Sequence, residues 1–211
     1  MMSNVKKYQS FKKPFNFMIN DEFLDPNLIK DFFRLNESLF KKSANVQVRL
    51  KNNKLSNKRN LLRVIEKNKL KIKSNKELIF FCKKMFRILK KNCDHSFLKN
   101  ININKSLLKK GEFNLSFCWD KPGYCAMPHT DTNRKIWSGI VYLFDDLKGN
   151  SGTTILKKNK GKYKKFKTIK PKINRLLAFK RSDKSHHSVE VSNKKRIILL
   201  INFNFKKKFF K

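Results

Sequence analysis

Two residues that can bind a metal ion lie two positions apart in the segment CAMPHTD, residues 125–131. Side chains alternate in direction along an extended segment, so His129 and Asp131 project from the same face. An imidazole and a carboxylate on one face supply two of the three protein ligands of a facial metal site. Because the tripeptide H-x-D is frequent by chance, this interpretation depends on a third ligand from elsewhere in the chain.

The segment SHHSVEV, residues 185–191, provides two candidates for that third ligand, His186 and His187. Neighbouring residues on a strand face opposite ways, so only one of the two imidazoles can point inward. Two imidazoles and one carboxylate on one side of a metal form the facial triad of non-haem Fe(II) oxygenases, which leaves positions open for a cosubstrate and oxygen. The residues by themselves leave both histidines open.

Arg196 begins the segment RIILLINF, which is apolar on both faces and is therefore expected in the interior. A guanidinium in the interior is hardly ever found unpaired. Either a carboxylate from a distant segment of the chain pairs with Arg196, or a bound ligand supplies a carboxylate that accepts two hydrogen bonds from it. Both interpretations place an anion beside this strand.

The first part of the chain, residues 1–110, is predicted to be a mainly helical support region. Asp25 can cap a helix that the following proline begins, and apolar residues then recur at helical spacing to about residue 41. Ser74, with Glu77 three residues later, forms a capping-box pattern for a second helix that continues to about residue 92. The polar segment 51–60 between the two helices is predicted to be a loop.

The second part, residues 111–211, is predicted to be a catalytic jelly-roll core, because apolar and polar side chains alternate there. Eight short strands are expected, at 113–118, 124–129, 136–144, 153–156, 163–169, 175–180, 187–191 and 196–204. The predicted fold class is α+β, a double-stranded β-helix (jelly roll) core with N-terminal supporting helices, in one compact domain.

Five features of residues 111–205, in this order and spacing, resemble the Fe(II)- and 2-oxoglutarate-dependent dioxygenases of the prolyl-4-hydroxylase-like type. They are H-T-D at 129–131, a strand ending in Tyr142 and Leu143, G-T-T-I-L at 152–156, N-R-L-L-A-F at 174–179, and H-S-V at 187–189 with Arg196 nine residues beyond His187. The segment PFNFMINDEFLDPNLI near the start also resembles the opening of these enzymes.

The resemblance implies a role for each candidate residue. His129, Asp131 and His187 would bind Fe(II), and Arg196 would bind the distal carboxylate of 2-oxoglutarate with the Tyr142 hydroxyl as a second donor. Other expected participants are O2 and, as a supporting reductant, ascorbate. The reaction would convert 2-oxoglutarate to succinate and carbon dioxide and hydroxylate an unactivated C–H bond, since halogenating relatives lack the carboxylate that Asp131 provides.

One position departs from the family pattern. Ten residues before the first histidine ligand, relatives often carry a tyrosine that lines the cosubstrate pocket, and this sequence has Trp119 there. The wall of the pocket is therefore expected to differ from that of relatives.

Other enzymes and a binding protein are alternatives to this interpretation. A zinc hydrolase could use the same three ligands, but the sequence lacks H-E-x-x-H and Arg196 would be unexplained. A cupin-like metal enzyme would not need Arg196 at that spacing. A basic nucleic-acid-binding protein would use the lysine-rich segment 157–172, with Tyr163 and Phe166 as stacking faces.

Charge and composition limit the classes of partner that we expect. The formal net charge is +37, but 43 of the 52 basic residues are lysine, whereas nucleic-acid recognition relies on the planar arginine fork. We therefore attribute the charge to an AT-rich coding composition and expect no nucleic-acid partner. The predicted substrate is a small or glycan-type metabolite, for which an anionic group would suit the charge, and a peptidyl proline substrate is the alternative.

No apolar run approaches the ~20 residues that a membrane-spanning helix needs, and no secretory signal follows the basic first residues. We therefore predict a cytoplasmic protein without a membrane span.

Overall fold

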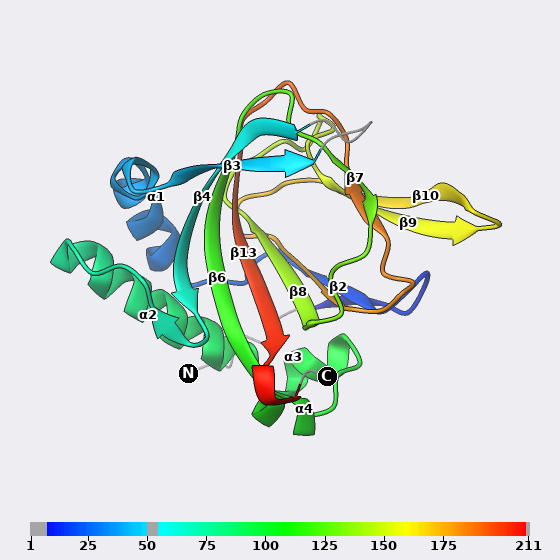
Figure 1. Ribbon diagram of the computed structural model, residues 1–211, viewed down its shortest axis with the longest axis horizontal. Coiled ribbons are helices and arrows are strands. Elements are labelled where there is room, and N and C mark those ends of the chain that lie inside the picture. The colour runs from blue at the N-terminus through cyan, green and yellow to red at the C-terminus, as the bar shows by residue number, and fades with distance from the viewer. Residues whose placement is uncertain (1–7, 50–54, 210–211) are drawn as a thin grey trace.

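Two antiparallel sheets form the body of the protein in the computed structural model, which describes residues 8–49 and 55–209 (Figure 1). The large sheet has the spatial order β1 (Gln9–Phe11), β2 (Phe17–Asn20), β11 (Leu176–Lys180), β8 (Lys135–Tyr142), β13 (Arg196–Phe205), β6 (Gly111–Asp120), β4 (Leu55–Glu66) and β3 (Ala44–Arg49), with β5 (Lys69–Leu70) paired to β4. The small sheet has the order β10 (Lys162–Ile169), β9 (Thr153–Asn159), β12 (His187–Val189) and β7 (Ala126–His129). This arrangement is the predicted jelly roll, and all eight predicted strands are present.

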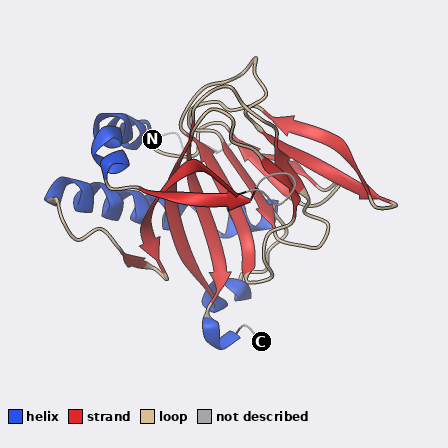
Figure 2. Ribbon diagram, turned by 45° about the horizontal axis from the view of Figure 1, so that its top comes forward, coloured by secondary structure: helices blue, strands red, loops and turns tan. Residues whose placement is uncertain are grey.

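Two long helices cover the outer face of the large sheet, α1 (Pro26–Lys41) and α2 (Lys76–Asn92) (Figure 2). The predicted start of α1 is confirmed, since the Asp25 side chain accepts a hydrogen bond of 2.8 Å from the backbone N–H of Asn27. The apolar stripe of α1 packs on the sheet, where the Phe32 ring stacks on Phe117 with 5.1 Å between centroids. Two short helices, α3 (His95–Asn100) and α4 (Ser106–Lys110), and a 3-10 turn, η2 (Lys207–Phe209), lie at one end of the large sheet.

The start of α2 differs from the predicted capping box by one residue. Asn75, not Ser74, is the N-cap, and its side chain accepts a hydrogen bond of 3.1 Å from the backbone N–H of Leu78. Glu77 does not reach back to the cap, because its carboxylate pairs with Arg34 of α1. Asn75 therefore caps α2, while Glu77 joins α2 to α1.

The prediction of a loop at 51–60 is wrong from residue 55 onward, because β4 begins there. Residues 51–54 lie outside the described residues. β4 pairs with both β3 and β6, and its Arg59 stands opposite Asp120 of β6. The polar composition that suggests a loop comes partly from a charged side chain that pairs across strands instead of facing water.

Alternation along β6 and β13 gives the large sheet two different faces. Phe117 and Leu199 join the outer core against the helices, whereas Cys118 and Ile198 join an inner core between the two sheets. The same alternation turns Asp120 inward, two residues after Cys118.

Both parts of the chain contribute to the large sheet, since β2 pairs with β11 and β4 pairs with β6. The boundary at residue 110 stays a prediction, and the described residues of the first part form five strands besides the helices. In the part of the chain that the structure describes, no helix has the length and apolar character to cross a membrane.

Candidate metal centre

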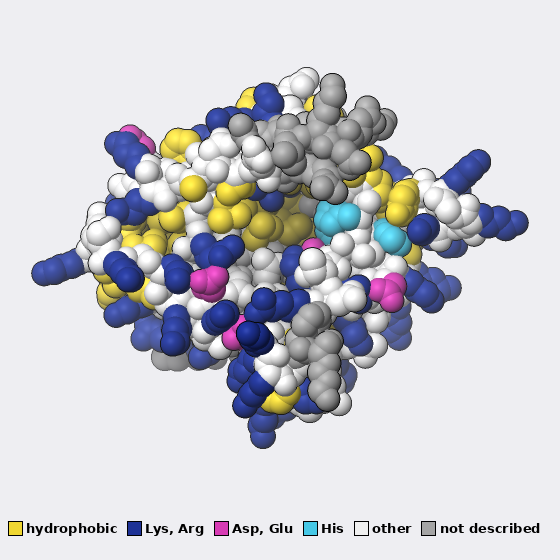
Figure 3. Space-filling model, viewed as in Figure 1, with side chains coloured by type: hydrophobic (Ala, Val, Ile, Leu, Met, Phe, Trp, Pro, Cys, Tyr) yellow, Lys and Arg dark blue, Asp and Glu magenta, His cyan; other side chains and the backbone are white. Residues whose placement is uncertain are grey.

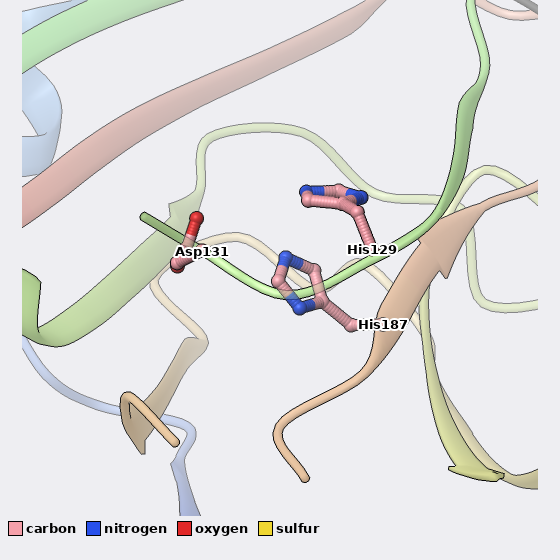
Figure 4. Close-up of side chains that lie close together, drawn as sticks. All are labelled: His129, Asp131 and His187. Carbon is pink, nitrogen blue, oxygen red and sulfur yellow. The ribbon is translucent and has the colours of Figure 1, made fainter. Parts of the chain in front are cut away.

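His129, Asp131 and His187 come together at the small sheet. His129 ends β7, Asp131 follows in the next loop, and His187 begins β12, directly opposite His129 in the register of the two strands. Their potential ligand atoms all lie within 4.8 Å of one another. The two rings and the carboxylate are turned toward a common point (Figure 4).

Backbone carbonyls fix the orientation of both imidazoles. His129 Nδ1 lies 2.6 Å from the carbonyl oxygen of Met127, and His187 Nδ1 lies 3.0 Å from that of Ser185. A carbonyl oxygen can only accept, so each Nδ1 carries a proton, which in a neutral ring leaves the lone pair on Nε2. Such hydrogen bonds set the tautomer that a metal-binding histidine requires.

The charge states of the cluster also suit a metal ion. Burial lowers the pKa of His187 to about 4, so its imidazole is neutral at neutral pH. Burial opposes ionisation of Asp131, but Lys135 and the hydrogen bonds outweigh it and lower the pKa of the carboxyl. Its two oxygens accept hydrogen bonds from Lys135 Nζ at 2.7 Å and from Ser138 Oγ at 2.5 Å.

His186 lies apart from this group, with its ring 5.2 Å from the ring of Tyr163. It borders a cleft of about 740 Å³, which we call the lysine cleft, beside the β9–β10 hairpin. The cleft is also lined by Lys13, Pro14, Lys157, Lys158, Lys160, Gly161, Phe166, Asp183 and Lys184. On the face shown in Figure 3, histidine side chains lie beside a hollow that has hydrophobic side chains in its wall.

Arg196 is 1% exposed and donates a hydrogen bond of 2.8 Å from Nη1 to Asp120 Oδ2. A carboxylate from a distant segment does pair with it, as one of the two sequence-based interpretations required. Asp120 is shared with Arg59, whose Nε and Nη2 lie 2.5 Å and 2.9 Å from its two oxygens. Among the described residues, Arg196 Nε has no hydrogen-bond partner.

Tyr142 and Trp119 lie on different faces of the large sheet. The Tyr142 hydroxyl is in the inner core, where it donates a hydrogen bond of 2.8 Å to Thr153 Oγ1. Trp119 faces the helices, and its Nε1 donates a hydrogen bond of 2.9 Å to Asn36 Oδ1. Trp119 itself therefore does not line the inner face, because alternation along β6 directs the next residue, Asp120, inward instead.

Sequence reasoning missed the partners of the predicted residues. Ser138 and Lys135 hold Asp131, and Asp120, which also pairs with Arg59, holds Arg196. The spacing of Asp120 from Cys118 marks it as inward-facing, but nothing local to Arg59 indicates its partner, because the pairing depends on the register between β4 and β6.

Comparison with known proteins supports the interpretation of the fold and site. Residues 114–204 match the family model of the 2OG-Fe(II) oxygenase superfamily. No curated protein sequence matches the chain significantly.

Three solved structures share the fold. A Pseudomonas putida prolyl-4-hydroxylase has a TM-score of 0.58 at 15% identity, covering 90% of this chain and 92% of that one. A Trichoplax adhaerens prolyl hydroxylase, in complex with a hypoxia inducible factor oxygen degradation domain peptide fragment, has a TM-score of 0.57 at 20% identity, covering 91% and 84%. A collagen prolyl hydroxylase of Paramecium Bursaria Chlorella virus-1, in a 2OG complex, has a TM-score of 0.53 at 17% identity, covering 90% and 96%.

The chain matches the 2OG-Fe(II) oxygenase superfamily over residues 114–204 and has the fold of prolyl-4-hydroxylase-like members of that superfamily. It is a dioxygenase whose cofactor is Fe(II) and whose cosubstrates are 2-oxoglutarate and O2. The cluster fits that metal, because two imidazole nitrogens and one carboxylate oxygen on one side are the donor set of non-haem Fe(II) oxygenases.

Proposed function

We propose that the protein hydroxylates an unactivated C–H bond of a small, anionic metabolite, such as a glycan-type intermediate, with Fe(II) held by His129, Asp131 and His187. The observation that carries this proposal is the convergence of three ligand atoms within 4.8 Å, with both imidazoles already in the tautomer that binds metal. Bound iron supplies oxygen activation that is coupled to decarboxylation of 2-oxoglutarate.

The chain's own residues prepare the site. Lys135 and Ser138 hold Asp131 ionised and fix the plane of its carboxylate. Arg196 faces the inner core, its Nε has no partner in the described part of the chain, and it is proposed to bind the distal carboxylate of 2-oxoglutarate. Tyr142 is proposed as the second donor, for which its hydroxyl proton would turn from Thr153 toward the cosubstrate.

The lysine cleft supports an anionic substrate. His186, which borders it, is the chain neighbour of the proposed ligand His187, so one segment of the chain joins the cleft to the candidate metal centre. Five of its lining residues are lysines and one is an aspartate. A cleft with one predominant sign of charge raises the local concentration of oppositely charged ligands.

A peptidyl substrate is the alternative. The structural neighbours include prolyl hydroxylases, but a shared fold does not determine the substrate. The cationic lining of the cleft favours the anionic metabolite.

Binding of 2-oxoglutarate to the anaerobic, Fe(II)-loaded protein tests the proposal, with the Zn(II)-loaded protein as a control for the metal-to-ligand absorption. We expect a visible absorption band that appears with 2-oxoglutarate and is absent from the His187→Ala variant. Tight zinc retention without 2-oxoglutarate binding would favour a zinc hydrolase or cupin-like enzyme instead.

A further inference from the structure

A row of three charged side chains crosses three neighbouring strands of the large sheet. Asp120 of β6 stands opposite Arg196 of β13 on one side and opposite Arg59 of β4 on the other. Residues directly opposite each other on adjacent strands place their side chains on the same face. The row Arg59–Asp120–Arg196 therefore lies at one end of the inner face of the jelly roll.

The carboxylate in the middle of the row is used by both arginines. Asp120 Oδ1 accepts from Arg59 Nε at 2.5 Å, and Oδ2 accepts from Arg59 Nη2 at 2.9 Å and from Arg196 Nη1 at 2.8 Å. The Tyr124 ring lies against both guanidinium groups, 4.4 Å from the Cζ of Arg59 and 5.4 Å from that of Arg196. Arg59 thus forms a bidentate ion pair with Asp120, whereas Arg196 donates to only one of the Asp120 oxygens.

The row carries one unbalanced positive charge. Its two arginines and one carboxylate are almost fully buried, with exposed side-chain fractions of 13%, 1% and 0% for Arg59, Arg196 and Asp120. Cys118 and Tyr124 face the row but stay neutral at neutral pH, because burial is the main cause that raises the pKa of each to about 12. A buried, unbalanced charge whose Nε has no partner among the residues that the structure describes indicates that an anion completes the row.

We propose that Arg59 and Asp120 position Arg196 and set its effective charge, so that the pocket selects an oxo acid with a distal carboxylate. Asp120 anchors the Arg196 guanidinium through Nη1 and leaves Nε free. Arg59 balances the charge of Asp120, so the charge of Arg196 remains available to the ligand. This inference rests on the proposed function of Arg196.

Arg59 acts as a positioning residue and need not touch the cosubstrate. Without it, Asp120 and Arg196 would form a neutral buried pair, and a dicarboxylate would have to compete with Asp120 for the guanidinium. An oxo acid that lacks the distal carboxylate forms no ion pair with Arg196. Removal of the Arg59 charge should therefore weaken the binding of the dicarboxylate only.

The experiment compares 2-oxoglutarate with 2-oxobutanoate, which keeps the keto acid but lacks the distal carboxylate. Dissociation constants are measured on the anaerobic, Fe(II)-loaded wild type, Arg59→Gln and Arg59→Lys by titration of the visible absorption band. We expect Arg59→Gln to raise the dissociation constant of 2-oxoglutarate about tenfold or more and to leave that of 2-oxobutanoate unchanged. Arg59→Lys should restore most of the lost affinity for 2-oxoglutarate. Equal weakening of both ligands, or no weakening of either, would overturn the inference.

The double variant Arg59→Gln/Asp120→Asn separates charge from structure. It removes one positive and one negative charge and leaves the row with the wild-type net charge of one. We expect its affinity for 2-oxoglutarate to exceed that of Arg59→Gln, whereas a purely structural role predicts a further loss. Thermal unfolding of each variant confirms that it is folded before titration.

Failure of this inference and failure of the proposed function give different results. If the wild type does not bind 2-oxoglutarate, the proposed function fails and the row is a structural ion cluster. If the wild type binds it and Arg59→Gln binds it equally well, only the inference about Arg59 and Asp120 fails.

Discussion

Each candidate metal ligand depends on one or two close contacts that prepare it before any metal binds. The carbonyls of Met127 and Ser185 orient the imidazoles, and Ser138 holds the carboxylate. We expect His129→Ala, Asp131→Ala and His187→Ala each to abolish iron binding and turnover, because each removes one of the three proposed protein ligands. The measurement is iron content after anaerobic loading, together with succinate formation.

His186→Ala is the matched control for these ligand variants. His186 is the chain neighbour of His187 but faces the lysine cleft and the Tyr163 ring. We expect it to keep normal iron content. Iron loss in His186→Ala with retention in His187→Ala would reverse the choice of ligand.

Arg196→Ala should mainly raise the 2-oxoglutarate concentration needed for half-maximal turnover. The substitution removes the buried cation but leaves the iron ligands in place, so we expect an increase of at least about tenfold, as for loss of a buried charged hydrogen bond. The rate of succinate formation at a series of 2-oxoglutarate concentrations gives this half-maximal concentration. An unchanged requirement would mean that Arg196 serves only as the structural partner of Asp120.

The sequence predicts the ligands better than their supports. Alternation of side chains is enough to pair His129 with Asp131, and the structure confirms that they lie together. The choice of His187 over His186 needed the family resemblance, and the structure brings His187 to the cluster. Asp120 could not be assigned to Arg196 because they are 76 residues apart and meet only through strand register.

At the scale of elements, the β9–β10 hairpin extends away from the body of the protein and borders the lysine cleft (Figure 1). We expect Lys157→Gln/Lys158→Gln/Lys160→Gln to reduce turnover that is stimulated by phosphorylated sugars, because it removes three cations from the cleft. Binding of 2-oxoglutarate should not change. The measurement is succinate formation with phosphorylated sugars and with their neutral counterparts.

A variant of α2 provides the control for the hairpin. Lys76→Gln/Lys83→Gln/Lys91→Gln removes the same charge from exposed positions on the opposite layer of the fold. It should leave that turnover unchanged. Equal stimulation by phosphorylated and neutral sugars in the wild type would mean that the charge of the cleft plays no part in substrate binding.

The loop between β8 and β9 contains a buried carboxylate that should make the free energy of unfolding depend on pH in the acidic range. Asp146 accepts hydrogen bonds from the side chain and backbone of Ser151 and from Lys194 Nζ at 2.9 Å. Burial opposes ionisation, but these contacts outweigh it and lower the pKa of Asp146 to about 2. A lowered folded-state pKa means that the contribution to stability is present above the unfolded value of 3.8 and is lost as pH falls toward 2.

Urea unfolding of wild type and Asp146→Asn between pH 5 and pH 2 tests this contribution. We expect the free energy of unfolding to fall less steeply with acid in Asp146→Asn, since one carboxylate no longer takes up a proton on unfolding. Asp183→Asn, which changes a carboxylate with 90% side-chain exposure, is the control and should follow the wild type. Identical slopes for all three proteins would contradict the assignment.

Local sequence patterns predict the helices and strands of this fold to different degrees. The start of α1 and the eight strands after residue 111 follow from a cap, helical spacing and alternation. β4 could not be recognised, because its residues KRN are typical of a loop when read without the strands on either side. Its strand conformation depends on pairing with β3 and β6, which no local pattern encodes.

At the scale of the whole molecule, the net charge of +37 should make stability increase with salt. Like charges are closer together in the folded chain than in the unfolded chain, so their repulsion opposes folding, and salt screens it. We expect the midpoint of thermal unfolding to rise between 20 mM and 300 mM sodium chloride. A midpoint that falls would mean that the ion pairs stabilise the protein by more than the repulsion destabilises it.

β4 has a consequence for how proteins of this kind are compared with one another. Arg59 lies outside the segment 114–204 that matches the family model, while Asp120 and Arg196 lie inside it. A comparison restricted to that segment therefore omits one of the three charges in the row. Two chains that are similar across the segment need not prefer the same oxo acid, so classification by cosubstrate has to include the strand that precedes it.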